Sequence, residues 1–397
     1  MRGIVVPDRE EDFTADPVEL FFDLAYVFAF SRLVAHLIHH PDWTGAGEAL
    51  LLFLIIWFSW SWFTWIANGV SGNGRIARTI FLIATALTVP MAASVETAFD
   101  DGGSTFAFSA ALIMAISNVL GVVVHEPGSE HRQSALQLSI PSALALGVLL
   151  VGGYVDTPAR VWLWILSLAI LFGSTAFAGR NDWIVRSGHF AERHGLILII
   201  ALGEVIVAIG ISVTNGFDDG GLTANIRLGL FAAGIFAGLL WWSYFDRVLP
   251  ALEHRAESLD NASRGRFARD VYTWGHAPII GGVIVAAAAG EEILLHPSDH
   301  LHSEFRWMFA IGIAMFLCGI GITVYRSFQV VAKERLVGLG VIVVLCMISG
   351  SWEAVWLLVA VDVVLLVVLL VEHYRVEKRP NAIDREAERI ANDASGE

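Results

Sequence analysis

Charged residues are scarce in this chain. Asp, Glu, Lys and Arg make up 16% of its 397 residues, whereas a soluble domain carries about 25%. The hydrophobic share is 56%, and the mean hydropathy is +0.64. Twelve membrane-crossing segments would take about 240 residues at about 20 residues each, which leaves short connections and no room for a soluble catalytic domain. The composition therefore excludes most cytosolic enzyme folds, nucleic-acid-binding proteins and secreted disulfide scaffolds.

Cysteines and catalytic motifs are also scarce. The two cysteines, Cys318 and Cys346, lie inside apolar runs with no second cysteine nearby, as is typical of small buried hydrophobic residues. The sequence contains no P-loop, GxSxG, HExxH or Rossmann fingerprint placed after a strand. We therefore expect no disulfide, no cofactor, no metal site and no enzymatic activity. The net charge of −14 says nothing about partners, because the charges lie mostly in loops and tails.

Histidines form two groups next to predicted membrane segments. Each group contains a proline and an aspartate, and imidazole with carboxylate is a ligand set that suits zinc. An external metal or pH-sensing site is one interpretation. Solvated loop histidines are the favoured one, because no compact ligand motif is present. The residues are His36, His39 and His40 in the first group and His296, His300 and His302 in the second.

Long apolar segments predict an all-α, polytopic transmembrane helix bundle of eleven or twelve spans. The seven charges in residues 1–17 are unlike the start of a cleaved signal peptide, so we expect the first segment to be retained as an anchor. The expected spans are 18–38, 47–67, 79–98, 105–124, 134–152, 161–178, 195–213, 226–245, 271–295, 305–325, 336–350 and 352–372.

Basic residues alternate along these spans in a way that predicts their orientation. With twelve spans and a cytoplasmic N-terminus, 21 of the 25 Lys and Arg residues fall on the inner side and three on the outer side. Such a bias is what the positive-inside rule describes for short loops. We expect a multi-pass protein of the bacterial cytoplasmic (inner) membrane with both termini in the cytoplasm.

The two halves of the chain can be aligned with each other as a 6+6 parallel internal repeat. A shift of 181 residues aligns the intramembrane acids Asp23 and Glu204, and it also aligns Trp60 with Trp241. Several transporter folds use parallel repeats. The expected parts are an N-terminal cytoplasmic tail (1–17), a first half (18–178), a cytoplasmic connector (179–194), a second half (195–374) and a C-terminal cytoplasmic tail (375–397).

A few ionisable residues within the expected spans are candidates for function, because a charge in the bilayer is costly. Glu19 and Asp23 share one face of the first span. Glu19 is better explained as an acid in the first turn of a helix. The candidate transport or binding residues are Glu19, Asp23, Arg32, Glu96, Glu204, Asp246 and His276, with Trp60, Trp241, Glu291 and Glu292 as weaker candidates.

Several of these candidates have a structural alternative. Arg32 needs a partner on another span, for which Glu204, Glu96 or the Glu291-Glu292 pair could serve, unless it reaches the outer headgroups. Asp246 beside an arginine could form an interfacial salt bridge, and His276 could be a packing histidine. The tryptophans of the second and eighth spans form either an aromatic belt with packing, which is favoured, or the wall of a substrate cavity.

Motifs spread along the chain resemble those of one family. They are Val18-Glu19-Leu20-Phe21-Phe22-Asp23-Leu24, the Trp-rich second span, Glu192-Arg193-His194-Gly195-Leu196 through Leu202-Gly203-Glu204, the Trp-Trp-x-Tyr-Phe-Asp run at 241–246 and Gly275-His276-x-Pro278. The chain resembles the bacterial low temperature requirement A (LtrA) family over nearly all of its length. The resemblance implies a polytopic inner-membrane protein, and it supplies no established substrate or catalytic residue.

The leading hypothesis is a secondary transporter or permease for an unknown small solute or ion. Its site is expected between the halves, near Asp23, Glu204, Arg32 and His276. One alternative is a non-transporting membrane sensor or scaffold that supports growth in the cold, and a third is a lipid-acting enzyme within the membrane. The lipid bilayer is the expected partner, and no nucleic acid is expected.

Overall fold

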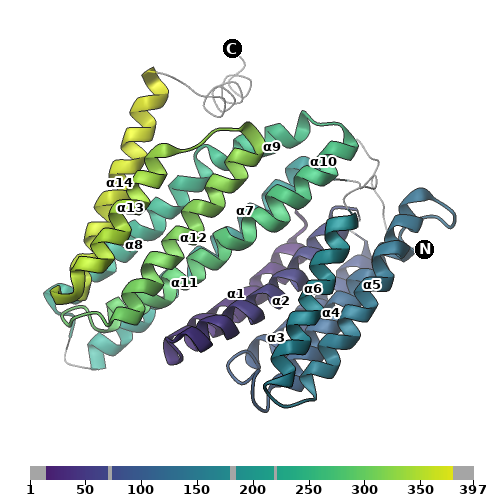
Figure 1. The fold of residues 1–397 in the computed structure, drawn as a ribbon, viewed down its shortest axis with the longest axis horizontal. Helices are drawn as coiled ribbons and strands as arrows, with labels where there is room; N and C mark the ends of the chain where they lie inside the picture. The colour runs from purple at the N-terminus through teal and green to yellow at the C-terminus, as the bar shows by residue number, and fades with distance from the viewer. Residues whose placement is uncertain (1–14, 70–73, 179–184, 219–220, 379–397) are drawn as a thin grey trace. The chain divides into compact units, whose positions relative to one another are not determined.

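The computed structural model describes residues 15–69, 74–178, 185–218 and 221–378. Within these ranges every regular element is a helix, and one isolated bridge pairs His300 with Glu353. Figure 1 shows the helices along the chain. Their bounds are α1 (Pro17–His39), α2 (Trp43–Ala67), α3 (Arg75–Ala93), α4 (Gly103–Val123), α5 (Glu130–Gly153), α6 (Ala159–Ala178), α7 (Ser187–Asp218), α8 (Ala224–Phe245), α9 (Val248–Glu257), α10 (Asn261–Phe267), the π-helix η1 (Ala268–Trp274), α11 (Gly275–Leu295), α12 (Ser303–Phe328), α13 (Lys333–Ile348), the 3₁₀ turn η2 (Ser349–Ser351) and α14 (Ala354–Lys378).

Eleven helical stretches within the described ranges are long and apolar enough to cross a membrane. This confirms the predicted all-α bundle with about twelve spans. The expected seventh span, 195–213, lies in α7, and some side chains of that helix are outside the described residues. The internal repeat stays a prediction. The expected tails and the first part of the expected connector lie largely outside the described residues.

Several helices begin at a residue whose side chain caps the first turn. Ser129 accepts a hydrogen bond from the backbone N–H of Arg132 at 3.3 Å, and Thr223 accepts one from Ile226 at 3.3 Å. Asp260 caps α10 by accepting from the N–H of Ser263 at 3.0 Å. The hydrogen bonds from Ser263 lower the pKa of the Asp260 carboxyl below its ordinary value. Ser, Thr and Asp are the residues that cap helices best, so these boundaries follow from the local sequence.

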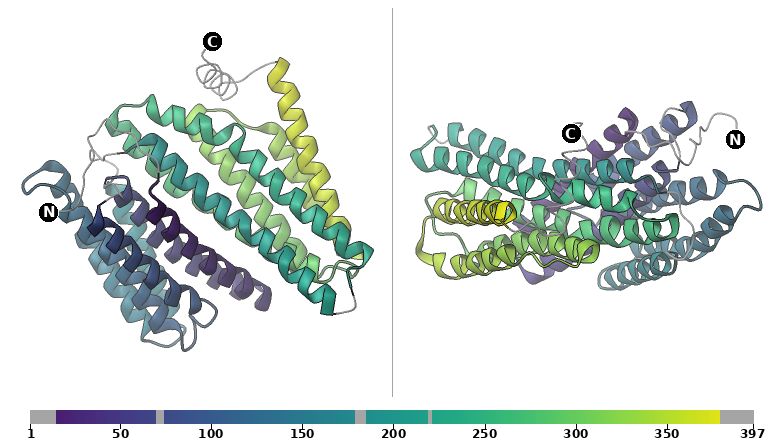
Figure 2. Two further views of the ribbon diagram at one scale, coloured as in Figure 1. Left: turned by 180° about the vertical axis from the view of Figure 1, so that it is seen from behind. Right: turned by 90° about the horizontal axis from the view of Figure 1, so that it is seen from above.

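The described helices fall into two compact units. Unit 1 consists of the described parts of Met1–His36, Gly47–Leu196 and Ala256–Thr273. Within it α3, α4, α5 and α6 pack as successive neighbours, and they lie side by side in both views of Figure 2. The indole of Trp57 donates a 2.8 Å hydrogen bond to the carbonyl of Thr273. This bond ties the segment with α10 and η1 to α2, far away in the sequence.

Unit 2 consists of the described parts of Leu37–Ala46, Ile197–Arg255 and Trp274–Glu397. Its closest helix pair is α11 with α12, while α14 packs against α8 and α13. Glycine makes the α11–α12 contact possible, because a Cβ atom at Gly282 would lie 2.6 Å from the carbonyl oxygen of Gly312. Small residues at helix crossings allow backbones to pack closely in membranes.

Large apolar side chains are exposed on the membrane-length helices. Ile140 and Phe231 are each 75% exposed, and Val337 is 68% exposed. A soluble protein rarely exposes many such side chains together, whereas a lipid-facing helix surface consists of them. The polar side chains that are buried therefore stand out, and they are concentrated on α1, α2 and the first turns of α7.

Candidate functional site

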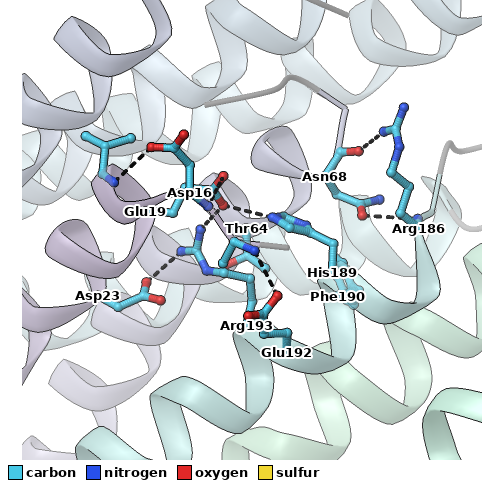
Figure 3. A network of polar contacts seen from close by, with 12 residues as sticks. Asp16, Glu19, Asp23, Thr64, Asn68, Arg186, His189, Phe190, Glu192 and Arg193 are labelled. Atoms are coloured by element: carbon cyan, nitrogen blue, oxygen red, sulfur yellow. Dashed lines mark hydrogen bonds and ion pairs between the residues drawn. The ribbon is translucent and has the colours of Figure 1, made fainter. Parts of the chain in front are cut away.

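Helices α1 and α7 bring two carboxylates to one guanidinium group inside unit 1. The Nη2 of Arg193 lies 2.6 Å from Asp23 Oδ1, and its Nη1 donates to Glu19 Oε2. The Nε2 of His189 lies 3.0 Å from the same Glu19 oxygen. Figure 3 shows Arg193 and His189 reaching from α7 toward the two acids. We call Glu19, Asp23, His189 and Arg193 the α1–α7 charge cluster.

The local sequence accounts for this geometry. Glu19 and Asp23 are four residues apart on α1, as are His189 and Arg193 on α7, so each pair lies on one helix face, one turn apart. Asp16 accepts a hydrogen bond from Val18 N–H at 3.1 Å and so fixes the start of α1. Two helix faces with complementary charges therefore meet over one helical turn.

A further polar contact supports the start of α7. The backbone N–H of Arg186 donates to Asn68 Oδ1 at 3.1 Å, and the guanidinium of Arg186 donates to the Asn68 carbonyl. Both residues are buried. They connect the end of α2 to the residue before α7, which holds His189 and Arg193 at the depth of the two acids (Figure 3).

The cluster is shielded from solvent and is unbalanced in charge. The side chains of Glu19, Asp23, His189 and Arg193 have no exposed surface. Trp60 donates its indole N–H to Asp23 Oδ1 at 2.7 Å. The other oxygen, Asp23 Oδ2, is buried and has no hydrogen-bond partner among the described residues. The cluster thus holds two carboxyl groups, one guanidinium and one imidazole.

Aromatic rings enclose the neighbouring His194. The centroids of the Phe190, Trp60 and Tyr272 rings lie 4.7, 5.1 and 5.1 Å from its ring centroid. Its Nδ1 lies 2.8 Å from the carbonyl oxygen of Phe190 and donates to it. Trp57 and Trp60 of the Trp-rich second span are 3% and 1% exposed. These tryptophans therefore pack inside unit 1, next to polar groups, and do not form an exposed aromatic belt.

The π-helix η1 completes this environment. Its last residues lie against α2, where Thr273 accepts the Trp57 indole at its carbonyl and the Trp65 indole at its hydroxyl, at 2.8 and 2.9 Å. A π-helix widens the turn and alters which backbone groups bond within the helix, and such segments occur frequently at functional sites.

The remaining candidates of unit 1 lie outside the cluster. Arg32 pairs with Glu96 at 2.6 Å, which identifies one of the three expected partners. The two side chains are 38% and 28% exposed, so this ion pair lies near the surface. His36, from the first histidine group, lies 3.3 Å from Glu48.

The candidates of unit 2 are placed separately. His276 is fully buried, and its Nε2 is hydrogen-bonded to the hydroxyl group of Tyr244. Glu204 is 3% exposed. Because these residues belong to unit 2, the expected approach of Glu204 and His276 to Asp23 stays a prediction. The buried acid Asp362 on α14 also lies in this unit.

Other unit 2 candidates lie near the surface. Asp246 ends α8 and pairs with Arg247 at 3.2 Å with 45% of its side chain exposed, in the manner of an interfacial salt bridge. Trp241 is 46% exposed. Glu291 and Glu292 lie near the end of α11 and are partly exposed, and Glu292 lies 3.9 Å from His296.

No group of three or more His, Cys, Asp or Glu side chains that could hold a metal ion is present in the part of the chain that the structure describes. In the second histidine group, His296 is also near Asp299 at 3.7 Å, and His300 lies 3.1 Å from the carbonyl of Trp352.

Sequence reasoning missed His189 and Arg193. Both lie in the segment expected to be a cytoplasmic connector, 179–194, and Arg193 is one of the 21 bases expected on the inner side. The structure instead begins α7 at Ser187 and buries both side chains. The available signal was the run Glu192-Arg193-His194 at the very edge of an apolar segment.

Comparisons with known proteins agree with the fold. The sequence matches the family described as Bacterial low temperature requirement A protein (LtrA) over residues 14–370. It is 26% identical over 311 residues to "Uncharacterized protein RA0937" of Rhizobium meliloti (strain 1021), covering 76% of this chain and 75% of that protein. No solved structure matches. With residues 14–370 matched and a bundle of membrane-length helices, the chain belongs to the bacterial low temperature requirement A (LtrA) family.

Proposed function

We propose that this protein is a secondary transporter of the cytoplasmic membrane in which the α1–α7 charge cluster binds the coupling proton. The observation that supports it is the excess of buried carboxylate: Glu19 and Asp23 share the single guanidinium of Arg193, and Asp23 Oδ2 has no partner among the described residues. The transported species is a small solute or ion, and the surrounding partner is the lipid bilayer.

Charge balance gives the cluster its chemistry. A buried ion pair tolerates burial when each charge is matched, whereas an unmatched buried charge costs several kcal/mol. With two acids and one arginine, the cluster reaches neutrality when one proton is taken up by Asp23, Glu19 or His189. Release of that proton leaves one net negative charge in the cluster. Proton binding and the packing of α1 against α7 therefore depend on each other.

The matched ion pairs elsewhere in the chain favour transport over a purely structural role. A scaffold needs only pairs of one acid with one base, and Arg335 with Glu372 is such a pair, with its closest atoms 2.7 Å apart. The α1–α7 charge cluster departs from this pattern with side chains that have no exposed surface. An intramembrane enzyme would need an acid and histidine group open to lipid, whereas Glu19, Asp23 and His189 have no exposed surface.

The proposed orientation places both termini in the cytoplasm. Its support is the distribution of bases, with 21 of 25 on one side of a twelve-span arrangement. Fusing a reporter that is active on one side of the membrane to residue 397 would test this. Activity characteristic of the periplasmic side would contradict the orientation.

Transport is tested with purified protein in proteoliposomes. Uptake of a panel of ions, amino acids, sugars and organic acids is measured with and without an imposed pH gradient. We expect gradient-stimulated uptake of at least one solute by the wild type, and loss of the stimulation in Asp23→Asn and Glu19→Gln. Asp246→Asn is the matched control, because that acid forms an exposed pair with Arg247.

Two results would contradict the proposal in different ways. Uptake that is unchanged in both cluster variants would place the coupling site elsewhere. Absence of uptake for every solute, with protein shown to be folded and correctly inserted, would favour the membrane scaffold.

A further inference from the structure

Unit 1 contains a cavity that the proposed function does not use and that no residue of the α1–α7 charge cluster lines. It encloses about 750 Å³ of empty space when the open solvent at its mouth is included. Residues of α2, α4, α5, α6, α10 and η1 line it. It lies toward the end of unit 1 at which α2, α4 and α6 end and α5 begins. We call it the Trp62 cavity.

The walls of the Trp62 cavity are largely apolar. Phe58, Trp62 and Ile66 come from α2, and Leu138 comes from α5. Aromatic and aliphatic walls of this kind favour the apolar body of a ligand through burial of its surface.

Two polar side chains on α4 are left without partners at this cavity. Ser117 and Asn118 both line it, and no hydrogen bond joins either side chain to another described residue. Ser117 is only 2% exposed. In a membrane-spanning helix an amide or hydroxyl normally bonds to a neighbouring helix or to backbone. A ligand with a polar head could supply the hydrogen bonds that these two side chains lack.

The only charged side chain that lines the cavity within the described residues is already neutralised. Arg269 contacts Asp270 Oδ1 through Nε at 2.8 Å and Nη2 at 2.7 Å, and its Nη1 donates to the Ala176 carbonyl at 3.1 Å. All three nitrogens are therefore engaged. An anionic ligand would find no available cation there, and no carboxylate among the described lining residues would pair with a cationic ligand.

We infer that the Trp62 cavity binds an uncharged amphiphile, a molecule with an apolar body and one hydroxyl or amide head that bonds to Asn118 and Ser117. The π-helix η1 contributes Arg269 and Thr273 to the cavity, and Thr273 also holds Trp57 and Trp65 of α2. A ligand here therefore contacts a residue that fixes the helix carrying Trp60. The inference stands whether or not the protein transports a solute, because it concerns binding alone.

The test is photo-labelling of the full-length protein in lipid nanodiscs. Three probes carry the same diazirine-bearing alkyl chain: a primary alcohol, the matching carboxylate and the matching hydrocarbon. Labelled residues are located by peptide mass spectrometry. We expect the alcohol to label the cavity segments 58–66 and 117–121 about tenfold more strongly than the carboxylate. Equal or stronger labelling of these segments by the carboxylate would overturn the inference.

Variants then assign the head-group contact. Asn118→Leu should reduce cavity labelling by the alcohol about tenfold, as expected for loss of one net hydrogen bond, with labelling by the hydrocarbon unchanged. Val119→Leu is the control, since Val119 is 61% exposed on the lipid-facing side of the same helix. Equal labelling by the alcohol in wild type and Asn118→Leu would contradict the contact.

Asp270→Asn provides a test of charge selection. It removes the carboxylate that engages Arg269, so the carboxylate probe should gain severalfold in cavity labelling. If carboxylate labelling does not increase in a variant that folds as the wild type does, Asp270 does not neutralise Arg269 toward a ligand.

Competition distinguishes the two sources of such a molecule. Dioctanoylglycerol added to the nanodisc represents a neutral lipid, and hexanol in solution represents a soluble alcohol. Displacement of the alcohol probe from segments 58–66 and 117–121 by either one supports the inference and identifies its source. Displacement by neither would overturn it.

Discussion

The guanidinium of Arg193 lies 2.6 Å from the carboxylate of Asp23, and neither side chain has any exposed surface. The two residues are 170 positions apart in the sequence. Each is tolerated inside a membrane-spanning bundle because the other is present, and Glu19 makes the arrangement unequal by adding a second carboxylate. The predictions below follow from this relationship and from the packing around it.

Removal of the guanidinium should destabilise the protein strongly. Arg193→Met leaves two buried carboxylates without a cation, and breaking a buried pair in this way costs about 3–5 kcal/mol. Thermal unfolding of the detergent-solubilised protein, followed by tryptophan fluorescence, would measure the loss. Arg32→Met is the matched control, because its partner Glu96 is 28% exposed, and we expect a change of less than about 1 kcal/mol there. Equal losses in the two variants would contradict the assignment.

The indole N–H of Trp60 should contribute separately to the cluster. Trp60→Phe removes the 2.7 Å donor to Asp23 Oδ1, and a hydrogen bond to a charged group is worth about 1.5–3 kcal/mol. Asp23→Asn should make the same substitution less costly, since the acceptor then carries no charge. A double-mutant cycle on unfolding free energies would measure this coupling. Strictly additive losses would mean that the two groups do not interact.

Glycine should be required at the α11–α12 crossing and replaceable on α8. Gly282→Leu would force side-chain atoms into the backbone at Gly312 and separate the two helices, so we expect loss of folded protein on size-exclusion chromatography. Gly234 and Gly238 form a GxxxG pair, but a Cβ at either position would meet open space. Gly234→Leu should therefore leave the elution profile unchanged.

The Asp260 cap should give a pH-dependent contribution to the stability of α10. Its pKa is lowered in the folded protein by the Ser263 N–H, so the ionised form is the one that folding favours. Its stabilisation is present above the ordinary pKa of an aspartate and is lost as the pH falls through the lowered pKa. The difference in melting temperature between wild type and Asp260→Ala should shrink on acidification over that window. A difference that grows on acidification would contradict the sign.

Much of the fold could be predicted from the sequence because it depends on local properties. Apolar segment length determines the membrane helices, and Ser129 and Asp260 mark helix starts through their own side chains. The pair Glu19 and Asp23 could be recognised because their four-residue spacing is local. Trp60 could be suspected from its place in the aromatic second span.

The rest depends on contacts between distant segments. Arg193 follows a basic connector and is typical of an inner-side loop, and only its two partners on α1 make its burial possible. Likewise, residues 256–273 are attached to unit 1 by contacts between distant residues, such as the bond between Trp57 and Thr273, which are 216 positions apart. Neither segment carries a local pattern that indicates its partner.

The most direct test of the central claim is whether the α1–α7 charge cluster holds a proton. Infrared difference spectroscopy detects the carbonyl stretch of a protonated carboxyl group, and Asp362→Asn is used as the background because that buried acid has an unpartnered Oδ1. If a carboxyl group carries the proton, we expect a carboxyl band that is lost in both Asp23→Asn and Glu19→Gln. If His189 carries the proton, we expect a carboxyl band that appears only in His189→Gln. Absence of the band in the background protein and in His189→Gln alike, at every pH at which the protein stays folded, would contradict the account.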